Sequence, residues 1–226
     1  MEKRVFIGVG HGGSDPGAVA GSIYEKNMNL PIAHACRAEL ERHGVTVLMS
    51  REMDEDESLS GKIQMANDFD AALALDIHNN AGGGDGAEVY HTYKGGTGKV
   101  LAENILQAVQ DIGQNSRGAK VIKNKNGVDG YLFIRNTYMP AVIVECAFID
   151  NAKDFTIIDT EQERTAMGVA IAKGVLKTLG IAWQAPSDKL YRVQIGAYKV
   201  KANAQAQLEK ARAAGFADAF ITEVNG

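Results

Sequence analysis

The sequence predicts an α/β protein with a mostly parallel central sheet flanked by helices. Short apolar runs alternate with longer segments in which apolar residues recur at helical spacing, and glycines follow several of these segments. Strands that alternate with helices are typical of a parallel sheet covered on both faces. The 226 residues are enough for one such domain with some length left over.

The first half of the chain supplies strands and helices in alternation. Arg4–Val9 is an apolar run ending in glycines, which indicates a buried strand. Tyr24–His43 carries apolar residues at helical spacing, and Gly44 follows as a stop signal. The other elements predicted here are strands at Val45–Met49 and Ala71–Ile77, a helix at Leu59–Phe69 behind Ser58, and an edge strand at Ala87–Thr92.

The second half continues this pattern and adds a tail. We expect helices at Lys99–Ile112 and Glu161–Leu179, a short strand at Ala119–Ile122, a loop with a helical turn at Gly127–Asn136, and a central strand at Ala141–Phe148. Residues 181–188, IAWQAPSD, read as a linker after a first domain of residues 1–180. The tail, residues 189–226, predicts a small βαβ segment with its helix at Asn203–Ala214.

Composition argues against several functional classes. A net charge of −4 does not indicate nucleic-acid binding, and no apolar run approaches the roughly 20 residues of a membrane-spanning helix. We therefore expect neither nucleic acid nor membrane as a partner. The short apolar stretch of MEKRVFIGVGHGG runs into a glycine-rich turn without a cleavage site, so we expect a first strand, no secretory signal and synthesis in the cytoplasm.

The two cysteines, Cys36 and Cys146, are expected to be buried thiols in a reduced compartment. Cys146 follows Glu145 and is a conceivable nucleophile. We disfavour that reading because no histidine lies near it in the sequence.

Four ionisable residues, His11, Glu25, His78 and Glu145, form the candidate site because they lie at predicted strand ends or at a helix start. In an open α/β sheet, ligands gather outside the carboxyl ends of the strands. Two imidazoles and one carboxylate suit Zn²⁺ with a position left for water, and a further carboxylate can transfer protons. This combination predicts metal-dependent hydrolysis.

The surroundings of these residues favour that role without excluding others. Glycines beside His11 let the backbone approach an ion, and Glu145 lies in the apolar segment AVIVECAFI, where an isolated carboxylate is costly. The alternatives are a turn histidine in solvent at position 11, a helix-starting acid at position 25, a loop histidine at position 78 and a structural ion pair at Glu145. Asp15 and Asp76 are candidates for orienting the imidazoles.

A dinucleotide-binding loop is a rival reading of the same region. Gly8, Gly10 and Gly13 satisfy G-x-G-x-x-G directly after a predicted strand. Residues 15–17, Asp-Pro-Gly, interrupt the place where the phosphate-binding helix would begin, and no acidic residue for a ribose follows Val45–Met49 directly. We therefore disfavour nucleotide binding.

Five segments in order, GHGGSDPG, YEKNMNLPIA, REMD, LALDIHNNA and YLFIRNTYMPAVIVECAFIDN, resemble the zinc-dependent N-acetylmuramoyl-L-alanine amidases of the Amidase_3 type over about residues 4–180. Such enzymes cut the amide between the lactyl group of muramic acid and L-alanine in peptidoglycan. The resemblance implies His11, Glu25 and His78 as Zn²⁺ ligands and Glu145 as the catalytic carboxylate. The sequence departs from the family at Lys62, usually arginine, and at Asn79, usually a small residue.

The tail segment YRVQIGAYKVKANAQAQLEKARAAGFADAFI resembles the first strand, helix and second strand of a SPOR domain, a module that binds peptidoglycan glycan. A unit under about 40 residues rarely stabilises itself. The tail can therefore dock on the first domain, pair with another copy, have lost part of its length, or be an appendage without a binding role. The oligomeric state stays open.

These observations together predict a peptidoglycan hydrolase in which zinc-activated water attacks the amide and Glu145 moves the proton. Such a protein resembles a phage endolysin that reaches the cell wall on host lysis. A bacterial autolysin of the same activity, a zinc peptidase acting on stem peptides and a non-catalytic wall-binding module are the alternatives.

Overall fold

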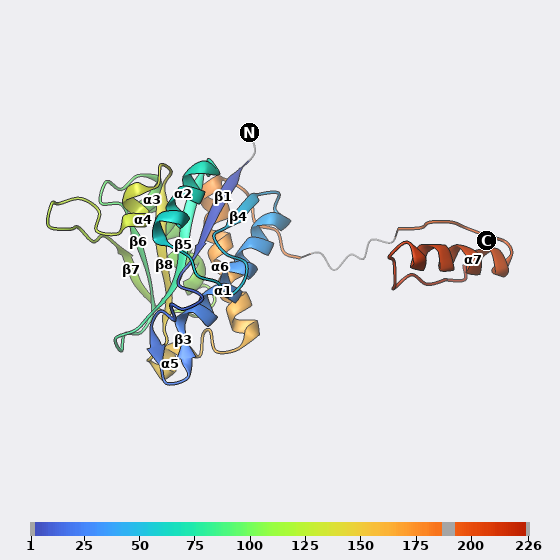
Figure 1. Ribbon diagram of the computed structural model, residues 1–226, viewed down its shortest axis with the longest axis horizontal. Coiled ribbons are helices and arrows are strands. Elements are labelled where there is room, and N and C mark those ends of the chain that lie inside the picture. Colours follow the sequence, from blue (N-terminus) through green and yellow to red (C-terminus); the bar gives the residue numbers. More distant parts are fainter. Residues whose placement is uncertain (1–2, 187–192, 225–226) are drawn as a thin grey trace. The chain divides into compact units, whose positions relative to one another are not determined.

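The computed structural model describes residues 3–186 and 193–224, and the chain divides into two compact units, Met1–Gln184 and Ala185–Gly226 (Figure 1). The first unit contains a six-stranded sheet, as the sequence predicts. In spatial order its strands are β4 (Thr46–Met49), β1 (Arg4–Val9), β5 (Leu73–Asn80), β8 (Ala141–Phe148), β6 (Ala87–His91) and β7 (Ser116–Lys120). All neighbouring pairs are parallel except β6 and β8, which are antiparallel.

Three long helices cover one face of the sheet. They are α1 (Glu25–Arg42), α3 (Thr97–Gln110) and α6 (Glu161–Leu179), and α1 and α6 lie side by side (Figure 1). Their apolar side chains form one core with Val5, Ile7, Val144 and other residues on that face of the strands. Alternation along each strand directs the intervening residues to the opposite face.

The opposite face is covered by two shorter helices, α2 (Leu59–Asp68) and α4 (Leu132–Asn136). A smaller core forms here from Phe6, Ala74, Ile143, Ala66 and Phe133. These helices cover the face only in part and leave the ends of β5 and β8 beside a cleft. The remaining elements of this unit are a two-stranded pair, β2 (Val19–Ala20) with β3 (Ile23–Tyr24), and the short helix α5 (Ala152–Phe155).

Local sequence signals account for the helix boundaries. Ser58 caps α2 by accepting a hydrogen bond from the Gly61 amide at 3.0 Å. Thr160 begins α6 in a capping box with Glu163, and Gly180 ends it in the left-handed conformation, with φ 72°. Among the described residues, none of the helices combines the length and the apolarity that crossing a bilayer requires.

Three of the predicted strands need correction. Ala71–Ile77 was expected to end before His78, but β5 continues to Asn80, so His78 lies within the strand. The strand expected at Ala87–Thr92 is not an edge strand, because β7 pairs on its outer side. The strand β7, expected at Ala119–Ile122, begins earlier, at Ser116. In each case the strand bounds follow hydrogen bonding to a neighbour, which periodicity alone does not reveal.

The second unit contains α7 (Lys201–Ala213), close to the helix predicted at Asn203–Ala214. Within residues 193–224 no strand flanks this helix, so the predicted βαβ pattern is seen only in its helix there. Part of the first predicted strand falls on residues 187–192, which lie outside the described residues. A two-stranded pair alone is marginal in water, which is a physical reason why apolar alternation gives no strand among residues 193–224.

Residues 181–184, expected to begin the linker, pack on the first unit. The indole Nε1 of Trp183 donates to Glu39 Oε1 at 2.5 Å, and the Gln184 amide donates to His43 Nε2 at 3.0 Å. Arg42 Nη2 donates to the Gln184 carbonyl at 2.5 Å. These contacts attach the segment to the end of α1.

Candidate metal centre

His11 leaves the end of β1 in an unusual backbone conformation. Its φ is 58°, in the left-handed region, which costs roughly 1–2 kcal/mol for a residue with a Cβ. Asp15 stabilises this arrangement because its Oδ2 lies 2.7 Å from His11 Nδ1 and its Oδ1 accepts from the Gly17 amide at 3.0 Å. Asp15 thus orients the first imidazole, as the sequence predicts.

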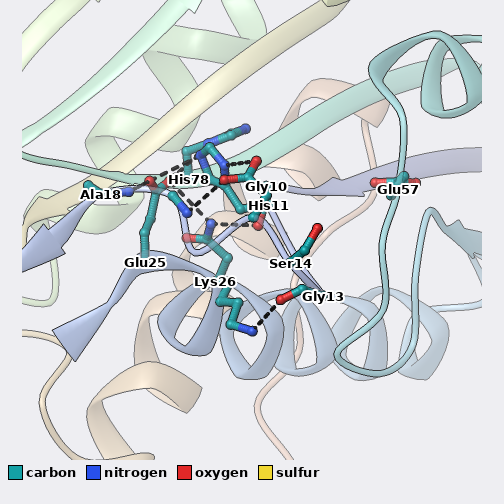
Figure 2. A network of polar contacts seen from close by, with 12 residues as sticks. Gly10, His11, Gly13, Ser14, Ala18, Glu25, Lys26, Glu57 and His78 are labelled. Carbon is teal, nitrogen blue, oxygen red and sulfur yellow. Dashed lines mark hydrogen bonds and ion pairs between the residues drawn. The ribbon is translucent and has the colours of Figure 1, made fainter. Parts of the chain in front are cut away.

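Glu25, the first residue of α1, is buried and faces both imidazoles (Figure 2). Its Oε2 accepts from the Ala18 amide at 2.9 Å and lies 3.1 Å from His11 Nε2. Its Oε1 accepts from the Asn79 amide at 3.0 Å and lies 2.9 Å from His78 Nδ1. The reading of Glu25 as a mere helix-starting acid does not account for these four contacts.

The structure brings His11, Glu25 and His78 together from three separate elements. One ligand atom from each lies within 4.8 Å of the others, and the two imidazole rings meet edge to face with centroids 5.0 Å apart. Two imidazole nitrogens and a carboxylate oxygen form the donor set that Zn²⁺ accepts in catalytic sites, with a further position open. The residues present therefore fit the expected ion.

The carboxylates of this cluster raise the pKa values of the two imidazoles that would bind a metal. Burial alone lowers the pKa of His78, but Asp76 and Glu25 outweigh burial and raise that pKa to about 10. The hydrogen bond with Glu25 raises the pKa of His11. Burial alone raises the pKa of Glu25, but hydrogen bonds from both imidazoles hold it well below its ordinary value. A cation that replaced these protons would meet the same carboxylate.

Glu145 lies on β8 directly opposite His78 on β5, so both side chains lie on the same face of the sheet. Burial raises the pKa of Glu145 to about 7. Among the described residues its carboxylate forms no hydrogen bond or ion pair, so the structural ion pair considered above is not observed. A carboxyl group with a pKa near neutrality is suited to accept and return a proton.

A buried ion-pair network lies beside the imidazole of His78. Lys62 Nζ lies 2.9 Å from Asp76 Oδ1 and 3.4 Å from Glu57 Oε2, and it donates to the Val9 carbonyl at 3.1 Å. The other oxygen of Asp76 lies 3.4 Å from His78 Nε2. Lys62 and Glu57 were not among the predicted site residues. The position of Lys62 in α2 gives no sign of this contact, because it depends on how α2 crosses β5.

A cleft of about 360 Å³ opens over this cluster. Its lining includes three residues of the predicted set, His11, His78 and Glu145, and also residues of the segment predicted to be a loop with a helical turn, where the structure has the short helix α4. Those additional residues are Tyr131, Leu132 and Phe133, at the start of α4. The apolar run YLFI was the sequence signal that could have identified these residues, because a fully solvated loop does not need four consecutive apolar side chains.

The other candidates from the sequence have local explanations. His34, His43 and His91 each contact a backbone carbonyl outside the cluster. Cys36 and Cys146 are buried, and burial raises the pKa of both thiols.

The glycine motif also has a structural explanation. A Cβ at Gly10 would lie 2.3 Å from the His78 ring, and one at Gly8 would lie 2.5 Å from Asp76 Oδ1. These glycines make room for the metal-site side chains, which explains the match to a dinucleotide fingerprint without a nucleotide.

Comparison with known proteins agrees with this geometry. Residues 5–177 match the family N-acetylmuramoyl-L-alanine amidase, Amidase_3, and residues 172–225 match the SPOR domain. The sporulation-specific N-acetylmuramoyl-L-alanine amidase of Bacillus subtilis (strain 168) is 35% identical over 217 residues, covering 94% of this chain and 82% of that protein. The endolysin of Bacillus phage SPP1 is 32% identical over 190 residues, covering 80% of this chain and 68% of that protein.

Solved structures show the same architecture. Cwp6 from Clostridium difficile is similar with a TM-score of 0.77 and 36% identity, over 79% of this chain and 30% of that chain. The N-acetylmuramoyl-L-alanine amidase AmiC2 of Nostoc punctiforme is similar with a TM-score of 0.72 and 29% identity, over 79% of this chain and 97% of that chain.

Proposed function

Because the chain belongs to the N-acetylmuramoyl-L-alanine amidase family, we propose that it hydrolyses the amide between N-acetylmuramic acid and L-alanine with the aid of a Zn²⁺ ion. Peptidoglycan amidase activity is the coarse function that the relatives share. One observation carries the finer proposal: three metal-type ligands converge beside Glu145, a half-buried carboxylate without another partner among the described residues.

His11, Glu25 and His78 would hold the ion. Bound there, Zn²⁺ would supply Lewis acidity, which activates water and polarises a carbonyl oxygen. The protein's own contribution is to fix the three ligands: Asp15 orients the imidazole of His11, and Asp76 lies beside that of His78.

Glu145 is proposed to manage the proton. Its carboxylate accepts the proton of the water that attacks the amide, and the resulting carboxylic acid returns this proton to the leaving nitrogen of L-alanine. The raised pKa of Glu145, about 7, suits both steps, because the carboxylate is available near neutrality and the acid is not too weak to give the proton back. Tyr131, Leu132 and Phe133 line the same cleft and limit access of bulk water.

The second unit is proposed to hold the enzyme on its polymeric substrate. The SPOR match supports peptidoglycan as the binding target of this unit. The relatives include both a sporulation amidase and a phage endolysin, and the cleavage proposed here is the same in a bacterial and in a phage setting. In either setting the enzyme acts on the cell wall.

Digestion of purified cell walls tests the proposal. The intact chain should release amino groups that are identified as L-alanine N-termini, leave the glycan strands uncut, and lose this activity when a chelator removes the metal. Glu145→Gln serves as the inactive control. New amino groups at other stem residues would indicate a peptidase instead. Sedimentation with walls and no cleavage, even with Zn²⁺ added, would indicate a binding module.

A further inference from the structure

The sheet face that carries the metal centre continues beyond it toward β7. Glu145 on β8 is paired with His78 on one side and with Glu88 of β6 on the other. In the next row Ile143 is paired with Tyr90, and Tyr90 is paired with Lys120 of β7. Because directly paired residues point to the same face, Glu88, Tyr90 and Lys120 extend the face of the proposed base.

Glu88 is a buried carboxylate that fixes two cations on this face. Its side chain is 4% exposed, and its Oε1 accepts from Lys120 Nζ at 2.5 Å and from Arg117 Nε. Its Oε2 accepts from the Tyr90 hydroxyl at 2.6 Å. Burial alone raises the pKa of Glu88, but these donors outweigh burial and lower it, so the carboxylate stays ionised. Together the two cations and one carboxylate carry one net positive charge.

Arg117 reaches this face only because β7 contains a bulge. Ala87 is paired with Ser116 and Val89 with Ala119, so two steps along β6 correspond to three along β7. The extra residue, Gly118, has φ 89°, in the left-handed region that favours glycine. Without the bulge, strict alternation would place Arg117 and Lys120 on opposite faces. Bulges near active sites commonly redirect a side chain in this way.

The two cations remain accessible to a ligand. The side chains of Arg117 and Lys120 are 41% and 33% exposed. Arg117 contacts Glu88 through Nε, and among the described residues its terminal guanidinium nitrogens donate no hydrogen bond. The guanidinium lies over the Phe148 ring at 5.2 Å, which limits its rotation. A pre-oriented guanidinium beside an ammonium is suited to bind a carboxylate.

We propose that Arg117 and Lys120, positioned by Glu88, form a subsite for a carboxylate of the peptide portion of the substrate. This inference rests on the proposed function and adds an orientation to it. The glycan beside the scissile amide consists of N-acetylated sugars without charge, whereas the stem peptide carries carboxylates. The stem peptide therefore lies over β6 and β7, and the carboxylate of its second, acidic residue meets Arg117 and Lys120 on β7, two strands beyond Glu145.

Two defined muropeptides test the subsite: one with a free carboxylate on the second stem residue, and one with a carboxamide there. The intact Zn²⁺-loaded wild type should cleave the acidic form with about tenfold higher kcat/KM, as expected for a partly exposed charge-assisted hydrogen bond. Arg117→Gln and Lys120→Gln should each lower kcat/KM for the acidic form, mainly through KM. Neither should change cleavage of the amidated form by more than about twofold, which also controls for folding.

Lys177→Gln is the matched control, because it removes the same charge from an exposed position on α6, on the opposite side of the sheet. It should leave both substrates unaffected. Equal kcat/KM of the wild type for the two substrates, or equal losses on both in Arg117→Gln, would overturn the subsite. If the wild type cleaved neither muropeptide and no cell wall, the proposed function itself would fail. Cleavage without discrimination would refute the subsite alone.

Discussion

His78 and Glu145 occupy directly opposite positions on the adjacent parallel strands β5 and β8. One register pair therefore places a proposed metal ligand beside the proposed proton acceptor, without any contribution from a flexible loop. A slip of one residue in this pairing would direct Glu145 to the helix-covered core on the other face. The sheet register thus fixes how these two residues of the candidate site lie relative to each other.

Replacing Glu145 with Gln should remove proton transfer while the metal ligands stay in place. We expect kcat to fall by about 10²- to 10⁴-fold, the usual contribution of a positioned general base. Metal content, measured by elemental analysis of the purified protein, should remain that of the wild type. Glu103→Gln, an exposed position on α3 that pairs with Lys99, is the matched control. Near-normal turnover in Glu145→Gln would contradict the assigned role.

Replacing His78 with Ala should cost the protein its metal. The variant would lack one of the three proposed ligands, so both zinc occupancy and amidase activity should fall to background. His34→Ala removes an imidazole that lies 3.0 Å from the Glu52 carbonyl oxygen, away from the proposed ligands, and should retain both zinc and activity. Full zinc occupancy in His78→Ala would exclude this residue from the ligand set, whatever the activity.

Metal binding should release protons. The pKa of His78 is raised to about 10, so this imidazole holds a proton near neutrality in the metal-free protein, and the pKa of His11 is raised as well. Ligation requires neutral imidazole, so metal affinity falls as the pH falls. Titration calorimetry at pH 7 in buffers of different ionisation enthalpy should give at least about one proton released per metal ion. An affinity independent of pH between 6 and 8 would argue against these protonated imidazoles.

The same Glu145→Gln change should stabilise the metal-free protein at alkaline pH. The folded pKa of Glu145, about 7, lies above the ordinary value of 4.5, so its stabilising contribution is complete below pH 4.5 and is lost as the pH rises through 7. Relative to the wild type, the variant should therefore gain about 1–3 kcal/mol of unfolding free energy between pH 4.5 and 8. Urea unfolding at both pH values measures this. An identical difference at both would mean that Glu145 is not desolvated.

Gly168 in α6 should not tolerate a side chain. A Cβ there would lie 2.4 Å from the Ile32 carbonyl oxygen and 2.8 Å from the Cys36 amide nitrogen, both backbone atoms of α1. Gly168→Ala should therefore destabilise the fold by about 1–3 kcal/mol. Gly98→Ala in α3 meets only ordinary contacts, at 3.6 Å, and should raise stability by up to about 1 kcal/mol through helix propensity. Thermal unfolding of the two variants distinguishes packing from propensity.

Sequence patterns were sufficient where they reflected local or strongly apolar signals. The central strand at Ala141–Phe148 and the helix at Glu161–Leu179 have the predicted bounds, because continuous apolar runs and capping residues mark them. His11 and Glu145 were found because a histidine among glycines and a carboxylate in an apolar strand are both unusual. Their roles in the reaction remain predictions for the experiments above.

The missing parts depend on contacts between distant segments. Lys62 of α2 and Glu57 just before it reach the cleft through the contacts of Lys62 with Glu57 and Asp76, and Tyr131 lines the cleft at the start of α4. The proposed role of Arg117 could not be predicted from the sequence, because the bulge in β7 places its side chain on the face opposite to the one that strict alternation assigns. None of these relationships has a periodic signature in the sequence.

The carboxylate of Glu25 joins three parts of the chain, because it contacts the imidazole of His11, the main-chain amide of Ala18, and both the imidazole of His78 and the amide of Asn79 in β5. We expect a substitution at Glu25 to have two effects at once, because it would remove a proposed metal ligand and also the link between the loop before α1 and β5. We therefore expect that few substitutions at position 25 are tolerated during evolution. New substrate specificities are then expected to arise from substitutions at the edge of the cleft, where a side chain can change without altering the ligand set.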